Sequence, residues 1–438
     1  MHSMNPIKHA ILATSLFGCI PTIAGTTTTS DTPPATPAST ATGLLVGKFP
    51  GETAFDKVWS GFTLYKDDNN PILQEFALQG RLQIQTAIGH DEKGSFNMRD
   101  YKNSGKNENV WGDYIEARRA YLGFKSKWFQ NWKLEGQIDV DTDGLDGAGP
   151  GRTMYKDIYD LYLTYAPTDA LNISLGKQEI KLSREQEISS KEILTFERSL
   201  VTNLLHPGNL TGLWVSGKGI DEHWLYELGI YGNDQVREFT NLDGGILTLA
   251  KIGYDYSAQS KMDSAIVSFR YMHNSQPGFQ SDEVFKNYGP AASPAFSDSI
   301  CLSNDIIQGR FGLTTDVLYG FGYHGSADQK GVSKAVTQSD VFAINIIPSY
   351  FIADGWQLVG RLQYANSASA NGLSLPGRYE AVAPSTDKKG NTYTSVYAGI
   401  NYYIYGHKLK IMNGIEYSYL GGGDYNGYTF LSGLRLAF

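Results

Sequence analysis

From residue 73 to the last residue, the sequence repeats one pattern: stretches of about ten residues in which apolar and polar side chains alternate. Successive side chains of a β-strand point to opposite faces, so this pattern predicts strands with one apolar and one polar face. Sixteen such stretches are present. They span 73–88, 114–126, 130–142, 157–166, 170–181, 208–219, 223–231, 245–256, 262–273, 304–313, 315–324, 340–352, 355–366, 393–404, 407–419 and 427–438.

The first and last stretches show the two faces most clearly. One side of the first stretch carries Phe76, Leu78, Leu82 and Ile84, and the other carries Gln79, Arg81, Gln83 and Gln85. The last stretch places Tyr428, Phe430, Leu434, Leu436 and Phe438 on one side, and Thr429, Gly433 and Arg435 on the other. An apolar side suits lipid and a polar side suits water, so the strands are expected to separate the two.

The connections between the stretches alternate in length. Tight ones at 127–129, 167–169, 353–354 and 405–406 interleave with long polar ones at 89–113, 182–207, 274–303 and 367–392. Bacterial membrane barrels have short periplasmic turns and long outer loops, and they must close because a free strand edge cannot face hydrocarbon. The sequence therefore predicts an all-β fold: a 16-stranded antiparallel transmembrane β-barrel with short periplasmic turns, long outer loops and a polar, water-filled lumen.

The segment before the barrel is predicted in three parts. Lys8 and His9 precede the apolar run 10–20, which predicts a signal peptide over 1–24. The alternative is a lipoprotein box at 16–19 that would make Cys19 a lipidated terminus. Residues 25–42 are expected to be a Thr/Ser/Pro-rich flexible tether. Residues 43–72 are expected to be an irregular periplasmic lead-in, with a helical turn at 54–59 left open.

Charge and cysteine content exclude several classes of protein. The chain has 37 basic and 45 acidic residues, and cleavage after Ala24 would leave Cys301 as the only thiol. A net negative chain without long basic stretches is not expected to bind nucleic acid. A single thiol allows no intramolecular disulfide, so stability is expected to come from sheet closure and packing.

The motif search supports no enzyme and no cofactor. Asp139, Asp141 and Asp143 alternate as in a calcium loop, but Pro150 stands where an EF-hand needs Glu. A divalent cation on these three carboxylates, with Asp146, remains an alternative to a solvated acidic loop. The segment 212–218 resembles a phosphate loop, but Gly219 replaces the required Ser or Thr. No Gly-x-Ser-x-Gly or His-Glu-x-x-His motif occurs.

Several segments resemble the phosphate-selective porins of the porin O and porin P type. The resemblance rests on RRAYLGF at 118–124 followed by WKL at 132–134, DLYLTY at 160–165, ISLGKQ at 173–178 and SSKEILTFERSL at 189–200, in the family's order and spacing. The chain departs from the family at 180–184, where a Pro-Phe-Gly element is common, and at Asn209, where Arg is common.

The resemblance implies a trimeric sixteen-stranded porin in the outer membrane, surrounded by lipid and lipopolysaccharide. It implies a constriction loop folded inward after the fifth strand, here 182–206. It also implies that the terminal Phe438 is part of a signal read by the barrel assembly machinery. Such a channel passes small hydrophilic solutes, and in this family the expected solutes are anions such as phosphate.

Strand parity predicts which charged residues face the lumen. The basic ones are Arg81, Arg119, Lys125, Lys133, Lys251, Arg270, Arg310, Arg361, Lys408, Lys410 and Arg435. The acidic ones are Glu75, Glu135, Asp139, Asp141, Asp160, Glu227, Asp255, Asp316 and Glu416. The constriction loop adds Arg184, Lys191 and Arg198 against Glu185, Glu187, Glu192 and Glu197. This near balance leaves two interpretations open, an anion-attracting lumen or charges that pair with one another as in a general porin.

Two further functions remain as alternatives. A sugar-selective porin would need a line of aromatic side chains along the lumen, which strand parity does not show. A plugged barrel that conducts nothing would act as an anchor through its loops and tether.

Overall fold

The structure is a computed structural model that describes residues 53–97, 115–140, 155–234, 238–240, 242, 245–278, 280–281, 291–292, 296–323, 340–376 and 379–438. The chain divides into two units, residues 1–35 and 36–438, and the second unit contains every described element. The predicted signal peptide and tether and Cys19 lie outside the described residues. Within them, no helix is both long and apolar enough to cross a membrane.

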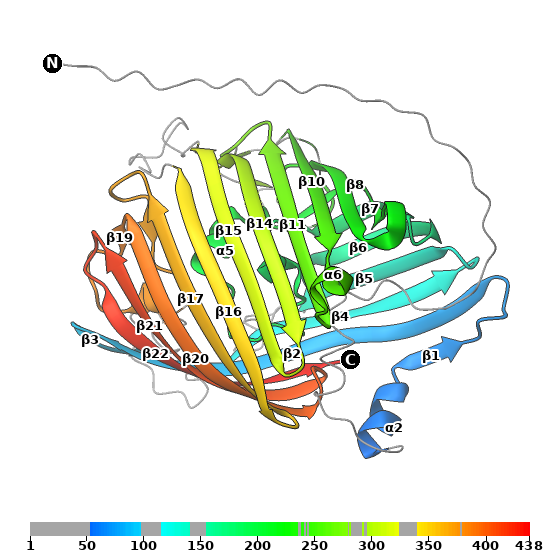
Figure 1. Cartoon of the computed structure of the whole chain (residues 1–438), viewed down its shortest axis with the longest axis horizontal. Helices are drawn as coiled ribbons and strands as arrows, with labels where there is room; N and C mark the ends of the chain where they lie inside the picture. Colours follow the sequence, from blue (N-terminus) through cyan, green and yellow to red (C-terminus); the bar gives the residue numbers. More distant parts are fainter. Residues whose placement is uncertain are drawn as a thin grey trace, which may run out of the picture. The chain divides into compact units, whose positions relative to one another are not determined.

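Sixteen antiparallel strands form a closed ring, as the alternation predicted (Figure 1). They are β2 (Leu73–Asp91), β4 (Glu116–Trp128), β5 (Trp132–Val140), β6 (Tyr155–Thr168), β7 (Leu171–Glu179), β8 (Asn209–Lys218), β9 (Trp224–Gly232), β10 (Ile246–Asp255), β11 (Ser264–Asn274), β14 (Phe296–Gln308), β15 (Phe311–Tyr323), β16 (Val341–Ala353), β17 (Trp356–Ser367), β20 (Thr392–Tyr405), β21 (Leu409–Gly421) and β22 (Asn426–Ala437). Strand β2 pairs with β4 on one side and with β22 on the other, which closes the ring.

The tenth strand differs most from its predicted bounds. It was expected at 304–313, but β14 spans Phe296–Gln308 and the chain turns at Gly309 and Arg310. Gly309 has φ +57°, a left-handed conformation that glycine adopts without steric cost. The sequence alternates through the turn, so periodicity alone did not locate it.

The lead-in is more regular than expected. Helix α2 (Ala54–Ser60) begins with a capping box, in which Thr53 and Asp56 bond each other's backbone N–H groups. Strand β1 (Thr63–Lys66) pairs with residues 75–77, near the start of β2. The expectation of an irregular segment is therefore wrong for 54–60 and 63–66, and the helical turn left open at 54–59 is confirmed.

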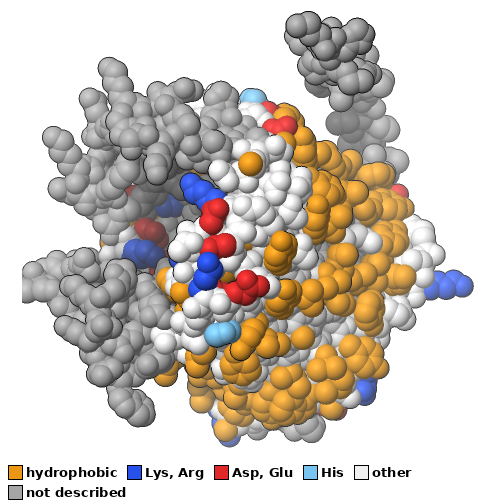
Figure 2. Space-filling model, turned by 90° about the vertical axis from the view of Figure 1, so that its left-hand side faces the viewer, with side chains coloured by type: hydrophobic (Ala, Val, Ile, Leu, Met, Phe, Trp, Pro, Cys, Tyr) orange, Lys and Arg blue, Asp and Glu red, His pale blue; other side chains and the backbone are white. Residues whose placement is uncertain are grey.

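The two faces of the wall differ as predicted. Large apolar side chains such as Leu122, Leu358 and Phe430 are exposed on the outside, and hydrophobic side chains cover much of the wall in Figure 2. Inside, Gln79, Gln83 and many other polar side chains are buried. Charged side chains gather beside a hollow at one side of the view in Figure 2.

The lumen also contains a hydrophobic core, which the sequence analysis did not predict. Its members include Leu182, Val201 and Leu205 of the segment after β7, packed with Leu318 and Met272 from the wall. Because this core occupies part of the barrel, the expectation of a uniformly polar lumen is wrong along these strands. The water-filled path is restricted to what the core and the loops leave free.

The remaining elements lie in the connections. They are β3 (Gly94–Asn97), α4 (Arg184–Glu187), α5 (Leu200–Leu205), η2 (Ile220–Glu222), α6 (Ser257–Ser260), β12 (Gln280–Ser281), β13 (Ala291–Ala292), β18 (Leu373–Ser374), η4 (Glu380–Val382) and β19 (Lys389–Gly390). Strand β3 pairs antiparallel with the last residues of β2, and β18 pairs with β19.

Candidate functional site in the barrel lumen

The segment 182–206 follows the fifth barrel strand and lies inside the ring, where Figure 1 shows α5 behind the front strands. We call it the constriction loop. Its apolar residues Leu182, Phe196 and Leu205 are each at most 3% exposed. These side chains pack with Met272 and Leu318 of the wall in one hydrophobic core, so the loop runs inward from the wall.

The first half of the constriction loop is held by charges on β10 to β15. Glu187 forms ion pairs with Arg270 at 2.7 Å, with Arg184 at 3.3 Å and with Lys251. Burial by itself raises the pKa of Glu187, but the charges of these three cations hold that pKa well below its usual range. The loop therefore neutralises Lys251 and Arg270, two of the wall cations that strand parity predicted to face inward.

Asp316 and Asp305 complete this attachment. Asp316 on β15 accepts from the backbone N–H groups of Arg184 and Glu185 at 2.9 and 3.0 Å, at the start of α4. Asp305 on β14 accepts from the Arg184 guanidinium at 2.9 Å. A carboxylate at a helix start satisfies N–H groups that have no partner within the helix.

The second half of the constriction loop is held by hydrogen bonds to its backbone carbonyls. Lys410 donates to the Ile193 carbonyl at 2.7 Å, and Arg435 donates to that of Phe196 at 3.3 Å. Arg361 bonds the Glu197 carbonyl and pairs with Glu416 at 2.8 Å. These wall residues lie on β17, β21 and β22, so the loop crosses the lumen from one wall to the other.

Glu197 is bound by two neighbouring arginines, of which sequence parity identified only one. Arg118 holds both carboxylate oxygens of Glu197 at 2.6 and 2.9 Å, and Arg119 approaches to 3.6 Å. The register between β2 and β4 shifts here, because Gln83 faces Arg119 while Ile84 faces Ala117. Arg118 is therefore the extra residue of a β-bulge, which turns its side chain inward beside that of Arg119.

A second bulge brings Tyr159 into the lumen. The register shifts between Gln137 opposite Asp160 and Ile138 opposite Ile158. The ring of Tyr159 stands 4.3 Å from that of Tyr121, and the Arg81 guanidinium lies 4.8 Å from the Tyr121 ring. Arg81 also bonds Gln137 at 3.0 Å and the Ser190 hydroxyl of the constriction loop. Sequence analysis missed the inward position of Tyr159, because strict alternation cannot show a bulge.

Six of the nine wall cations predicted to line the pore lie buried on the inner face, and Lys251 and Lys133 lie there half-buried. The six are Arg81, Arg119, Arg270, Arg361, Lys410 and Arg435. Four of these, Arg270, Arg361, Lys410 and Arg435, are at most 2% exposed. They hold the constriction loop rather than face open water, which corrects the simple pore-lining interpretation.

Arg310 is a clear correction. It lies exposed in the turn between β14 and β15 and donates to the Ile352 carbonyl at 3.4 Å. Lys408 likewise lies exposed in the turn between β20 and β21. Both were assigned inward by carrying alternation past the end of a strand.

The other predicted loop cations are engaged as well. Arg198 donates to the Ile188 carbonyl at 2.9 Å, and Lys191 donates to the Phe438 backbone oxygen at 3.4 Å. Burial, with the nearby charges of Arg81 and Lys125, lowers the pKa of Lys191 to about 8. Lys125 itself pairs with Glu75 at 3.4 Å.

The metal prediction finds no support where the structure describes the chain. Asp139 pairs with Lys156 at 2.9 Å, which occupies the oxygen a cation would need. Asp141 and Asp143 lie outside the described residues. No group of three His, Cys, Asp or Glu residues that fits a metal ion occurs within them.

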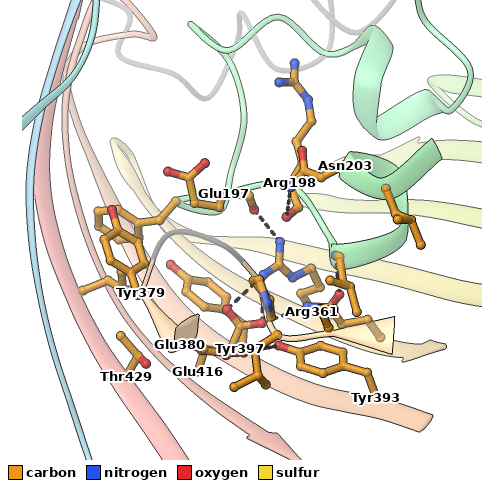
Figure 3. A pocket seen from close by; sticks show the side chains of 18 of the residues that line it. Glu197, Arg198, Asn203, Arg361, Tyr379, Glu380, Tyr393, Tyr397, Glu416 and Thr429 are labelled. Atoms are coloured by element: carbon orange, nitrogen blue, oxygen red, sulfur yellow. Dashed lines mark hydrogen bonds and ion pairs between the residues drawn. The ribbon is translucent and has the colours of Figure 1, made fainter. Parts of the chain in front are cut away.

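A cavity of about 420 Å³ lies between the constriction loop, the wall and the connection from β17 to β20 (Figure 3). Three arginines and three glutamates line it: Arg118, Arg198, Arg361, Glu197, Glu380 and Glu416. The inner face of β20 carries three tyrosines in succession: Tyr393, Tyr397 and Tyr403. Strand parity does therefore place a line of aromatic side chains inward, and the expectation that it shows none is wrong. All three are at most 3% exposed, so they offer no stacking track to a passing solute.

A closed barrel with an apolar outside, a charged inner wall and a loop that narrows the lumen defines a membrane channel of the porin class. The sequence model of phosphate-selective porin O and P matches residues 94–418. The chain belongs to this family, and it is an outer-membrane channel protein.

Solved structures with the same fold include two forms of OmpT, an outer membrane protein of Vibrio cholerae. The match to the form lacking loop L8 covers 83% of this chain, and the match to the in-vitro folded form covers 86%. Each match covers 99% of the OmpT chain, with 12% identity and a TM-score of 0.50. The outer membrane channel DcaP of Acinetobacter baumannii has 13% identity and TM-score 0.49, over 85% of this chain and 99% of its own. No curated protein matches the sequence.

Proposed function

We propose that this channel passes small hydrophilic anions, such as phosphate, by passive diffusion and without covalent chemistry. The observation that carries the proposal is a group of cations on β2, β21 and β22. Arg81, Lys410 and Arg435 have no Asp or Glu side chain within ion-pair distance among the described residues. Oxygens of the backbone, of the Ser190 hydroxyl and of the Gln137 amide bind them instead, and such neutral partners do not neutralise the positive charge of the two arginines.

The position of these cations supports a preference for anions. Lys410 faces Arg435 across β21 and β22, and Gln83 of β2 lies between Arg435 and Arg119. Buried charges are screened much less by salt than exposed ones. A positive potential at the narrowing would raise the local anion concentration and oppose cations.

The test is the reversal potential of single channels in planar bilayers under a KCl gradient, with phosphate added afterwards. We expect an anion-directed potential and block by phosphate. A unit charge about 8 Å from the ion path favours an anion by about 0.5 kcal/mol and disfavours a cation by as much, even in water-like surroundings. Arg81→Gln should therefore lower the anion-to-cation permeability ratio about fivefold.

Arg310→Gln is the matched control, because it removes one positive charge from an exposed turn at the end of the barrel. It should leave the permeability ratio unchanged. A cation-directed potential of the parent would overturn the proposal and leave a general porin. Block by sugars but not by phosphate would favour a sugar channel, and silence over many insertions would favour an anchoring barrel.

Three further expectations about the assembled protein are also proposals. The chain is proposed to lose residues 1–24 on export and to keep 25–42 as a tether. It is proposed to function as a homotrimer embedded in lipid and lipopolysaccharide, after insertion by the barrel assembly machinery. Native mass spectrometry of the protein extracted from outer membranes would give both the mature terminus and the number of chains.

A further inference from the structure

The connection between β17 and β20 also folds inward, and its described residues 368–376 and 379–391 are here called the inner lid. Leu373, Leu375, Tyr379 and Ala383 are each at most 8% exposed and belong to the same hydrophobic core as the constriction loop. The inner lid therefore packs inside the ring, in the same hydrophobic core as the constriction loop. Its residues line the cavity of Figure 3.

Two neighbouring residues attach the inner lid to the wall. The Tyr379 hydroxyl donates to Glu116 on β4 at 2.7 Å and is also bonded by Gln85 on β2. The Glu380 carboxyl group is bonded by the Tyr393 hydroxyl of β20 at 2.9 Å and by the Ser418 hydroxyl of β21 at 2.5 Å. Figure 3 shows Glu380 beside Glu416 in the lower part of the cavity.

Glu380 is 5% exposed, and no cation lies within ion-pair distance of it among the described residues. The groups that face it are Tyr393 on β20, Glu416 and Ser418 on β21, Tyr425 between β21 and β22, and Arg361 on β17. Both Glu416 oxygens already bind Arg361, at 2.8 and 3.0 Å. Lys388 of the inner lid donates to the Ala381 carbonyl at 2.5 Å and not to Glu380.

These surroundings disfavour a charge on Glu380. Burial, followed by the charge of Glu416, raises the pKa of Glu380 to about 8. The group is therefore mostly protonated at neutral pH, when it can both donate and accept a hydrogen bond. Because the pKa of Glu380 is raised in the closed state, its contribution to holding the inner lid is fully present below the ordinary glutamate pKa of 4.5, falls as the pH rises above that value, and is lost once the pH has passed about 8.

We propose that the inner lid is a pH-dependent closure of the lumen, held inward by the neutral carboxyl group of Glu380 and released when this group ionises. Ionisation would place a second carboxylate beside Glu416 in a buried site, which is unfavourable unless Glu380 moves into water. The far end of the inner lid would remain attached, because Ser385 bonds Asp91 at 2.5 and 3.0 Å and Thr386 bonds Asp424 at 2.8 Å.

Single-channel conductance as a function of pH tests this proposal, which goes beyond anion selectivity and does not depend on it. With a pKa of about 8, about a tenth of the Glu380 groups are ionised at pH 7 and nearly all at pH 9.5. We expect the parent conductance to rise at least about twofold between these values, since release of the inner lid opens a second constriction.

Glu380→Gln should remove the rise and keep the low conductance at pH 9.5, because the amide resembles the neutral acid and cannot ionise. Glu92→Gln is the matched control, since Glu92 is an exposed carboxylate that bonds Asn426 at the rim. That control should keep the full rise. Equal pH responses of the parent and Glu380→Gln would overturn the proposal.

A second measurement uses the parent protein alone, in case Glu380→Gln fails to fold. Hydrogen exchange of the Val382 and Ala383 amides, read by mass spectrometry of the peptide that contains them, should accelerate above pH 8 relative to a denatured control at the same pH. In the closed inner lid these amides donate to the Tyr379 and Glu380 carbonyls, before the attachment at Ser385. An unchanged relative rate between pH 7 and 9.5 would show that the inner lid stays closed and would contradict the proposal.

Discussion

At the scale of single residues, the lumen is organised by buried charges with specific partners rather than by a general excess of one sign. Glu187 collects Lys251, Arg270 and Arg184, while Glu197 collects Arg118 and Arg119. Removing one partner of a buried ion pair is costly because the remaining charge stays buried without compensation. The buried carboxylates of the constriction loop are therefore expected to contribute more to stability than the exposed ones.

Glu187→Gln tests this expectation. The change leaves Lys251 and Arg270 without an ion-pair partner among the described residues, while Arg184 keeps Asp305, and it should lower the free energy of unfolding by about 3 kcal/mol. The midpoint of the heat-dependent shift in unboiled SDS gels, or of urea unfolding, would measure the loss. Glu192→Gln is the matched control, since Glu192 lies exposed in the same loop; equal midpoints for the two variants would refute the role given to Glu187.

The pH dependence of this attachment has a definite sign. Because the pKa of Glu187 is lowered in the folded protein, its contribution is fully present above the ordinary glutamate pKa of 4.5 and is lost only as the pH falls through the lower folded value. The constriction loop is thus expected to stay attached under mildly acidic conditions. This response is opposite in direction to that proposed for the inner lid.

At the scale of elements, the lead-in covers the end of the barrel seam. Strand β22 ends opposite Arg81, and β1 continues along the same edge of β2 by pairing with residues 75–77. The Phe62 ring stacks on Phe438 at 4.0 Å, and the Trp59 indole donates to the Ala437 carbonyl at 2.7 Å. An uncovered strand edge invites pairing with other chains, so this cover protects the seam.

Phe62→Ala should weaken the seam by about 1–3 kcal/mol, through loss of an aromatic pair and of buried apolar area. The thermal midpoint of the barrel is the measurement. Leu64→Ala is the control, because Leu64 lies on β1, two residues after Phe62, and is 58% exposed. If both variants melted together with the parent, β1 and α2 would contribute nothing to closure.

At the scale of the whole molecule, the constriction loop acts as a strut between opposite walls. It binds β10 to β15 through Glu187 and α4, and β17 to β22 through its carbonyl groups. The same contacts set both the aperture and the charge that a solute meets. Aperture and selectivity are therefore expected to change together.

Replacing residues 185–204 by a short Gly/Ser linker tests this expectation, because it removes most of the constriction loop and leaves the barrel strands unchanged. The replacement removes four carboxylates and two cations, so the lumen gains two positive charges while its path widens. We expect a conductance increase together with a more anion-directed reversal potential. Heat-dependent mobility in SDS gels would verify that the barrel still forms. A wider channel with an unchanged or cation-directed potential would contradict the charge assignment.

The sequence by itself determined the number of strands, the faces of the wall and the closed fold. These features follow from side-chain alternation with a period of two, which each strand of about ten residues displays on its own. The place of the constriction loop in the chain came from resemblance to a family, and the tenth strand was misplaced because alternation continues across Gly309.

Only the tertiary structure decided which inward charges are free and which are bound. The contacts that matter join residues far apart in the chain, such as Arg361 with Glu197 and Tyr379 with Glu116. Arg118 and Tyr159 enter the lumen through bulges, which depend on the register against a neighbouring strand. Local alternation carries no information about partners across the lumen, so the inner lid, the hydrophobic core and the attachment of the constriction loop emerge only when the ring closes.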